Sequence, residues 1–371
     1  DGLSDVVEIA TLRESGYNLN IRRYVDNAPD PEPHDVRAHL LGGIPKSEVA
    51  AKASLFQAHG LNPKDVFIDR DERYFDFRPE LDNRQLLKPA IEGNTGLMAK
   101  ENKIRVAFEE WWKAHSPRIT DLTGQMDNTG NLVSLRSELL QSFSQSLESI
   151  DLLDPFQVRC IVAGFWYQSK YDFLTLMARG AEGVANAWRT SIITAMEDKA
   201  SKESPLEHKL VKFLLGDFVT ELAELDAKKA ELESHLKAAV SAKGEDGEET
   251  EGDTNESDEE STIDENQLKV WKSELTKVKK QLTLKKDSFT NQLNQAVDGL
   301  TPETAAALLL TIMHNDMQDI LGRYIAIQRK QIVDAFENWW DKYRGTLIEI
   351  ERTRDSAAQA LQSFLKELGY V

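Results

Sequence analysis

This chain of 371 residues lacks several features that would point directly to a chemistry. It has a single cysteine, Cys160, so no disulfide can form within the chain. Its seven histidines form neither an HExxH pattern nor a Cys/His cluster, which excludes the common zinc motifs. No phosphate-binding glycine loop and no GxSxG nucleophile motif occurs. A lone cysteine in an apolar stretch, without a signal-peptide pattern, predicts a protein of the reducing cytoplasm.

Long apolar runs are missing as well, and the excess of acidic residues is confined to one segment. No run of 18 apolar residues occurs, so the sequence predicts no membrane-spanning helix. The net charge is −18, but twelve acidic residues without a base lie between Glu245 and Glu265. The rest of the chain therefore carries a net charge of only −6. This balance allows a DNA-binding surface elsewhere but does not require one.

What is present is mostly helical periodicity, and the sequence predicts a mainly α fold with one small β-hairpin. Residues 1–85 are expected to form a short helix, an extended strap held open by prolines, and the hairpin between Asp65 and Phe77. Residues 86–204 predict a helical domain. Residues 301–371 predict C-terminal helices over about 302–340 and 346–368, the first of them capped by Thr301 before Pro302.

Residues 205–300 predict two long helices that fold back on each other. Apolar residues recur at alternating steps of three and four from Val211 to Ala239, and again from Leu268 to Phe289. Two heptad arms joined by a flexible link predict an antiparallel coiled-coil hairpin. The link, residues 243–266, contains only one large apolar residue, Ile263, and predicts a disordered acidic tip.

Two residue groups allow a functional interpretation beside a structural one. A set of aromatic residues predicts core packing, because Leu, Ile and Val surround it, although such rings can also stack on bases. A set of acidic residues could bind a metal, but the interspersed arginines favour solvated ion pairs. The aromatic set is Trp166, Tyr167, Tyr171, Phe173 and Trp188, and the acidic set is Asp65, Asp69, Asp71, Asp76 and Glu80.

The most specific motif is YNLNIRRYVD, from Tyr17 to Asp26, followed by prolines at 29, 31 and 33 and by AHLLGGIP at 38–45. Together with FEEWW at 108–112, LLDPFQVR at 152–159 and FENWWDKY at 336–343, it resembles the modification subunits of type I restriction–modification enzymes. In that family the first motif follows the catalytic domain, a DNA adenine-N6 methyltransferase that uses S-adenosylmethionine. The resemblance implies that this chain is the C-terminal portion of such a subunit, without its catalytic domain.

The motifs of methyl transfer are absent from the chain. An adenine-N6 methyltransferase needs a glycine-rich turn at its cofactor and an Asn-Pro-Pro-aromatic motif that holds the flipped base. Asn62-Pro63 continues into Lys64, and no glycine follows Asp154-Pro155 where the cofactor motif requires one. We therefore expect no catalytic, cofactor-binding or metal-binding residue here. The chain alone is expected to be inactive, and S-adenosylmethionine is the cofactor of the parent subunit.

The resemblance implies several partners: a specificity subunit that reads the target sequence, a restriction subunit, a second modification subunit, and DNA. In the family, C-terminal helices of the modification subunit pack against helices of the specificity subunit. Candidates for that surface are Trp339, Trp340, Tyr343, Leu361 and Phe364, although paired tryptophans suit a core equally well. Candidates for DNA phosphate contacts are Arg22, Arg23, Lys277 and Lys280. The lysines could instead pair with glutamates of the first arm, and the arginines could attach the strap to the catalytic domain.

Two other functions stay open from the sequence. A tail that reads DNA itself, as in enzymes that fuse modification and recognition, would need polar or basic side chains at base edges, and no concentrated set occurs. A coiled-coil scaffold unrelated to methylation would explain the hairpin and the acidic segment, but not YNLNIRRYVD. An Asn-Pro-Pro-aromatic motif upstream of Asp1 would decide for the methyltransferase family.

Overall fold

A computed structural model of the chain describes residues 6–20, 24, 33–124, 129–197, 204–244 and 265–368 and is mainly helical. The chain divides into two compact units: unit 1 comprises Asp1–Ala99 and Arg329–Val371, and unit 2 comprises Lys100–Gln328. Two long helices, α6 (Thr95–Thr120) and α12 (Pro302–Tyr343), each contribute residues to both units. Unit 1 is therefore discontinuous along the chain, whereas the divisions expected from the sequence at residues 85, 204 and 300 follow chain order.

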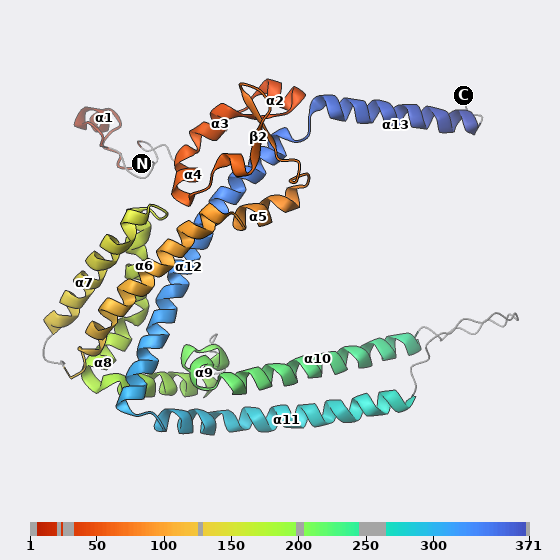
Figure 1. The fold of residues 1–371 in the computed structure, drawn as a ribbon. Coiled ribbons are helices and arrows are strands. Elements are labelled where there is room, and N and C mark those ends of the chain that lie inside the picture. The colour runs from red at the N-terminus through yellow and green to blue at the C-terminus, as the bar shows by residue number, and fades with distance from the viewer. Residues whose placement is uncertain are drawn as a thin grey trace, which may run out of the picture. The chain divides into compact units, whose positions relative to one another are not determined.

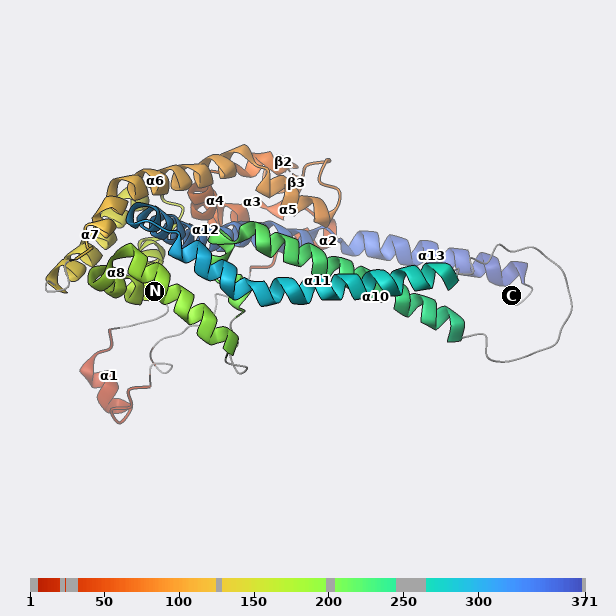
Figure 2. The ribbon, with the colours of Figure 1, turned by 90° about the horizontal axis from the view of Figure 1, so that it is seen from below.

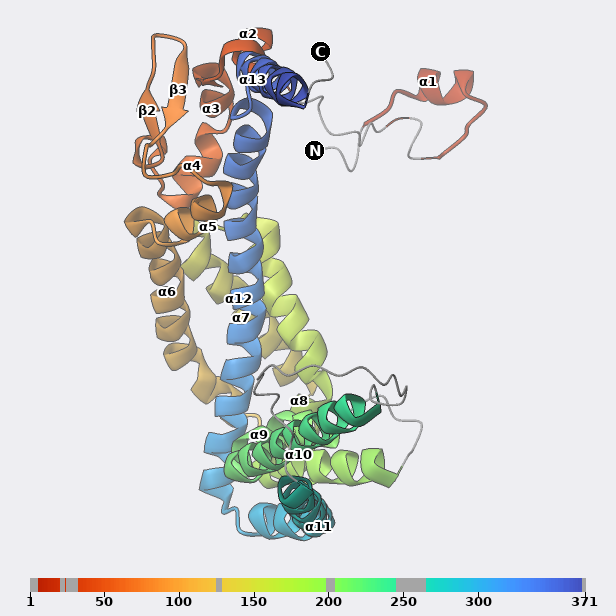
Figure 3. The ribbon, with the colours of Figure 1, turned by 90° about the vertical axis from the view of Figure 1, so that its right-hand side faces the viewer.

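A small antiparallel sheet lies in unit 1 (Figure 3). β2 (Phe67–Asp69) pairs with β3 (Tyr74–Phe77), with Phe67 opposite Phe77, which confirms the predicted hairpin. The other edge of β3 pairs with β1 (Ile44–Pro45), a strand that the sequence did not predict. Two residues are too short to show an alternating pattern. Proline fits at this edge position because it has no N–H to donate to a further strand.

Short helices surround this sheet, and one of them corrects the sequence prediction. α2 (Val36–Leu41) lies where an extended strap was expected, because Asp35 caps it by accepting the Ala38 N–H at 2.9 Å. Residues 21–23 and 25–32 of the predicted strap lie outside the described residues. The remaining short helices of unit 1 are α1 (Ile9–Glu14), α3 (Lys46–Ala51), α4 (Ala53–His59) and α5 (Arg84–Glu92), with a 3-10 turn at Pro63–Asp65.

The core of unit 1 forms where the last turns of α12 meet α4 and the sheet. Phe336 and Trp339 of α12 are buried against Phe56 of α4 and Phe67 of β2, with ring centroids 5.2–6.1 Å apart. The pairs are tilted or edge-to-face, which is the arrangement that aromatic rings prefer. This cluster attaches the C-terminal helix segment to elements formed almost 300 residues earlier.

Unit 2 is helical throughout its described residues, as the sequence predicted for residues 86–204. Its core contains buried residues of α6, α7 (Thr129–Leu147), α8 (Pro155–Glu197) and α12. The predicted aromatic core is correct for Trp166, Phe173 and Trp188, which are buried. It is wrong for Tyr167 and Tyr171, which are 84% and 74% exposed. Because an α-helix has 3.6 residues per turn, Tyr167 and Tyr171 lie on a different face of α8 from Trp166 and Phe173.

α8 is bent at Gly180. This residue has φ 69° and ψ −176°, which breaks the helix into two segments within the span from Pro155 to Glu197. A side chain at such a backbone conformation is strongly disfavoured, so glycine suits the position. The two segments present differently oriented faces to the same core.

Two long helices of unit 2 run side by side in opposite directions, as Figure 2 shows. They are α10 (Gly216–Gly244), which follows the short α9 (Lys209–Leu214), and α11 (Glu265–Asp298). Leu222 and Leu232 of α10 form a buried cluster with Val278 and Leu282 of α11. Of the predicted acidic tip, residues 245–264 lie outside the described residues, while residues 243, 244, 265 and 266 belong to the helix ends. Further 3-10 turns lie at Glu148–Ile150 and Pro205–Glu207.

Within the described parts of the chain, no single helix is both long and apolar enough to cross a membrane. Gln267–Asp298 and Pro302–Tyr343 meet the length and composition criteria only as a pair, bent by 113° at their connection.

Candidate protein-docking site

α13 (Leu347–Glu367) follows α12 in unit 1 and projects from the end of that helix (Figure 1). It begins with a capping box: the Thr346 hydroxyl accepts the Glu349 N–H at 3.1 Å, and the Glu349 carboxylate accepts the Thr346 N–H at 3.3 Å. Thr346 is buried, so the start of the helix is held by unit 1. None of the 21 residues of α13 itself is buried.

The exposed residues of α13 include a set that soluble helices normally bury. Six large apolar side chains keep between 45% and 70% of their area exposed. Most of the stability of a helix in a protein comes from packing of its apolar face, so such a face is normally buried. Exposed large apolar side chains gathered at the two ends of one helix make α13 the candidate interaction surface. Five of the six belong to α13, and the sixth, Leu368, is its C-cap residue; the five are Leu347, Ile348, Ile350, Leu361 and Phe364.

The attachment of α12 to the rest of unit 1 centres on a buried carboxylate. Glu48 of α3 accepts hydrogen bonds from Trp339 Nε1 at 3.2 Å, from Lys342 Nζ at 3.1 Å and from the Tyr343 hydroxyl. The Glu48 and Lys342 side chains are only 7% and 9% exposed. Lys342 also donates to the Pro33 carbonyl at 2.5 Å. A buried charge is tolerated when it is paired and hydrogen-bonded, and this one holds the last turn of α12 in place.

Tyr343 stays a neutral donor in this cluster. Burial raises the pKa of its hydroxyl, and the hydrogen bond to the Glu48 carboxylate raises that pKa further. The same hydroxyl accepts the Asp35 N–H at 3.3 Å. The Tyr343 hydroxyl therefore links α12, α3 and the start of α2 without carrying a charge of its own.

Asp35 completes the base of the site. Its carboxylate accepts the Ala38 N–H and the Tyr74 hydroxyl, the latter at 3.0 and 3.1 Å to its two oxygens. The pKa of Asp35 is lowered, mainly by the hydrogen bond from the Ala38 N–H. Partial burial raises this pKa, and the hydrogen bond from the Tyr74 hydroxyl lowers it further. Asp35 thus joins the cap of α2 to the central strand of the sheet.

Replacing Asp35 with alanine is expected to lower the free energy of unfolding by about 1 kcal/mol near neutral pH, because α2 loses its cap. Asparagine caps helices about as well as aspartate, so Asp35→Asn should keep most of this stability. Because the pKa of Asp35 is lowered in the folded protein, its charged carboxylate contributes fully to stability above the unfolded pKa of about 3.9. This contribution is lost as the pH falls through the lower pKa of the folded protein. Urea unfolding from pH 7 to about pH 2.5 measures both effects. Identical pH profiles for wild type and Asp35→Asn would contradict this role.

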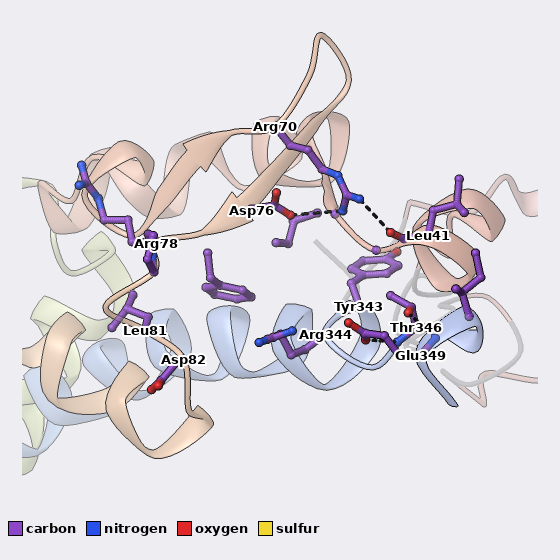
Figure 4. Close-up of a pocket in the computed structure, with 16 residues that line it drawn as sticks. Leu41, Arg70, Asp76, Arg78, Leu81, Asp82, Tyr343, Arg344, Thr346 and Glu349 are labelled. Carbon is purple, nitrogen blue, oxygen red and sulfur yellow. Dashed lines mark hydrogen bonds and ion pairs between the residues drawn. The ribbon is translucent and has the colours of Figure 1, made fainter. Parts of the chain in front are cut away.

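A cavity of about 600 Å³ lies between the β2–β3 hairpin and the junction of α12 with α13 (Figure 4). Arg70 spans it, donating to the Leu41 carbonyl at 3.0 Å and to Asp76 at 3.3 Å. Gly42 beside it has φ 79°, and a Cβ there would lie 3.0 Å from the Thr346 methyl. The guanidinium of Arg78 is likewise used, by the Lys64 carbonyl at 2.8 Å. Arg70 and Arg78 therefore have protein acceptors, whereas Arg344, which also lines the cavity, lies over the Trp340 ring with its guanidinium carbon 5.5 Å from the ring centroid.

The acidic residues of the hairpin form ion pairs, as the sequence favoured. Asp69 lies 2.5 Å from Lys46, Asp76 lies 3.3 Å from Arg70, and Asp71 lies 3.7 Å from Arg37. In the described part of the chain, no group of three or more His, Cys, Asp or Glu side chains has an arrangement that could hold a metal ion.

The five residues predicted to bind a partner separate into three groups by burial. Trp339 and Tyr343 are each 2% exposed, so they belong to the core of unit 1 and offer no surface to a partner. Trp340 is partly buried and packs on Phe77, with ring centroids 5.0 Å apart. Leu361 and Phe364 are 59% and 61% exposed on α13. Of the five candidates, only Leu361 and Phe364 on α13 are therefore exposed. The exposed Ile350, missed from sequence, lies one turn beyond Leu347 on this helix.

Of the four residues predicted to contact DNA, the structure describes only Lys277 and Lys280. Arg22 and Arg23 lie outside the described residues. On α11, Lys279 pairs with Glu233 at 2.9 Å, and Lys285 and Lys286 pair with Glu221 and Asp226 of α10. Lys277 and Lys280 are exposed, and within the described residues neither forms an ion pair. Pairing with acidic residues of the first arm is therefore confirmed for Lys279, Lys285 and Lys286, whereas DNA contact by Lys277 and Lys280 stays a prediction.

Comparison of the chain with protein-family models, with curated proteins and with solved structures finds no match.

Proposed function

We propose that this chain is the non-catalytic C-terminal part of a type I DNA modification subunit, and that α13 docks it on the specificity subunit. The parent activity would be transfer of a methyl group from S-adenosylmethionine to adenine N6. The observation that carries the docking role is α13, a helix of 21 residues without one buried side chain. The resemblance of YNLNIRRYVD and the motifs after it supports the choice of family.

The physical case for docking is the cost of leaving α13 uncovered. The six exposed large apolar side chains are spread from Leu347 to Leu368, on both ends of the helix. Fully burying one such side chain contributes about 1.5–3 kcal/mol, so a partner that covers several gains a useful binding free energy. The capping box at Thr346 and the Glu48 cluster supply a firm base from which the helix can be presented.

The remaining elements take supporting roles in this proposal. α10 and α11 would form an antiparallel coiled-coil hairpin, and Lys277 and Lys280 on its outer side would contact DNA phosphate. Arg22 and Arg23 would do the same near the catalytic domain. A restriction subunit and a second modification subunit would complete the assembly, which would act on DNA in the cytoplasm. The chain itself would hold no cofactor.

The test is a pair of substitutions on α13. Leu361→Asp with Phe364→Asp should weaken binding to the specificity subunit by roughly thirtyfold or more, corresponding to about 2 kcal/mol, because two apolar anchors become charged. Thermal stability should stay unchanged, since both side chains are exposed in the chain alone. Co-purification and calorimetry with the specificity subunit of the same system measure the affinity.

The matched control places two aspartates elsewhere on the same helix, at Gln359 and Ser363. Each position lies about 100° or more around the helix from both Leu361 and Phe364, so affinity should change less than threefold. Full affinity of the Leu361→Asp, Phe364→Asp variant would reject the docking role of α13.

A scaffold protein unrelated to methylation is the second candidate, because exposed α13 and the α10–α11 hairpin would serve any helical partner. Binding to a specificity subunit distinguishes the two candidates. A scaffold would show no affinity for it, whereas the proposed modification subunit would bind it through α13.

A further inference from the structure

The apolar residues of α13 follow a seven-residue pattern that the sequence analysis did not identify. From Leu347 to Leu368, residues spaced alternately three and four positions apart lie on one face of the helix. Such spacing keeps a narrow seam in line and is the signature of packing against another helix rather than against a sheet or a membrane surface. We call this the α13 seam: Leu347, Ile350, Arg354, Ala357, Leu361, Phe364 and Leu368.

One member of the α13 seam is charged. Arg354 stands in the third position, between Ile350 and Ala357. Among the described residues its guanidinium forms an ion pair only with its neighbour Asp355, at 2.7 Å, and both side chains are more than 60% exposed. Asp355 is the next residue along the helix and so points about 100° away from the seam. An exposed pair of this kind is weak and does not neutralise Arg354 once a partner covers the seam.

We infer that α13 packs on a helix that carries its own apolar seam and presents one carboxylate to Arg354. This inference rests on the proposed docking role of α13 and names the chemistry of the partner surface. Arginine keeps its charge at any physiological pH, so covering it without an acceptor is strongly unfavourable. A carboxylate opposite it accepts two parallel hydrogen bonds and also fixes the register of the two helices, as single polar residues in coiled-coil seams do.

The size of the seam residues defines the partner further. The middle of α13 is small, with Ala357, Ala358 and Ala360, whereas both ends carry large apolar side chains. A partner helix can therefore approach closely at the middle and insert a large side chain opposite Ala357. The carboxylate belongs one turn from that large residue, because Arg354 precedes Ala357 by three positions.

The experiment compares two arginines of the same helix. Arg354 lies in the seam, and Arg352 lies on the opposite side of α13, about 160° away. Affinity of the full chain for the purified specificity subunit is measured for wild type, Arg354→Glu, Arg354→Leu and Arg352→Glu. We expect both changes at Arg354 to weaken binding by about thirtyfold or more, since each leaves the partner carboxylate covered and unpaired. Arg352→Glu should stay within about threefold of wild type, as solvent-exposed charges contribute little.

Rescue gives the second readout. Single Glu→Arg and Asp→Arg changes in the helices of the specificity subunit should include one that restores binding to Arg354→Glu and to no other variant. The inference is overturned if Arg354→Glu binds as well as Arg352→Glu, or if Arg354→Leu binds more tightly than wild type, because neither fits a carboxylate facing Arg354. If one of these two results is obtained and the Leu361→Asp, Phe364→Asp variant still loses binding, only the inference about Arg354 fails. The proposed docking role of α13 is then retained. Unchanged binding by that apolar double variant defeats the proposed function itself.

Discussion

Replacement of Trp339 with alanine is expected to lower the free energy of unfolding of unit 1 by about 3–5 kcal/mol. Trp339 is 2% exposed and contacts the rings of Phe56, Phe67 and Phe336, with centroids 5.7–6.1 Å away. Its removal leaves a cavity bordered by aromatic rings that cannot all close in. It also takes away the indole N–H that donates to the buried Glu48.

Chemical denaturation followed by circular dichroism measures this loss. Trp340→Ala is the matched control: it removes the same side chain from the next position, which is only partly buried on Phe77. A clearly smaller loss is expected there. Equal losses from the two variants would show that burial of Trp339 is not what stabilises unit 1.

Replacement of Glu48 with alanine has the second large expected effect, also about 3–5 kcal/mol of stability. The change leaves the ammonium of Lys342 buried without its counter-charge and leaves the Trp339 and Tyr343 donors without an acceptor. Glu48→Gln should lose less, because an amide oxygen can still accept from Trp339 or Tyr343 while Lys342 stays unpaired. Thermal or urea unfolding at neutral pH measures both variants.

A surface ion pair on α12, the helix that carries Lys342, serves as the control for Glu48. Lys330 lies 2.6 Å from Asp334 on α12, with side chains 73% and 53% exposed. Asp334→Ala should cost less than about 1 kcal/mol, since water solvates the lysine that remains. If Glu48→Ala cost no more than this exposed pair, the cluster at the end of α12 would not be what holds that helix in unit 1.

These variants also separate stability from binding. Trp339 and Glu48 stabilise the base of α13, whereas Leu361 and Phe364 lie on its exposed face. Changes at Trp339 or Glu48 should lower the free energy of unfolding. They should lower affinity for the partner only to the extent that unit 1 unfolds. Changes on α13 should lower affinity with no loss of stability. The contrast follows from the finding that the α13 residues are uncovered in the chain alone.

Local patterns in the sequence predicted many of the elements correctly. Periodic apolar residues predicted the long helices of unit 2, and the hairpin of β2 and β3 followed from two short apolar runs around a charged turn. Two elements of unit 1 were missed. β1 has only two residues, and α2 depends on the Asp35 cap within a proline-rich region, so neither carries a periodic signal.

The candidate site was found only in part. Leu361 and Phe364 were correctly placed on one face of a C-terminal helix, since three- and four-residue spacing is visible in the sequence. The full α13 seam was not identified, because Arg354 and Ala357 interrupt the apolar pattern near its middle. Trp339 and Tyr343 carried the same aromatic signal as an interface anchor, and no local pattern distinguishes the two cases.

The sequence by itself determined which residues form helices and strands, because hydrogen bonds between near neighbours and apolar periodicity act over a few residues. Only the tertiary structure decided which apolar faces are covered. Trp339 is buried because Glu48, Phe56 and Phe67 meet it, and the first of these lies 291 positions away along the chain. Burial depends on contacts between distant segments. Trp339 therefore became part of a core and α13 became exposed, although both had been candidates for the same surface in the sequence.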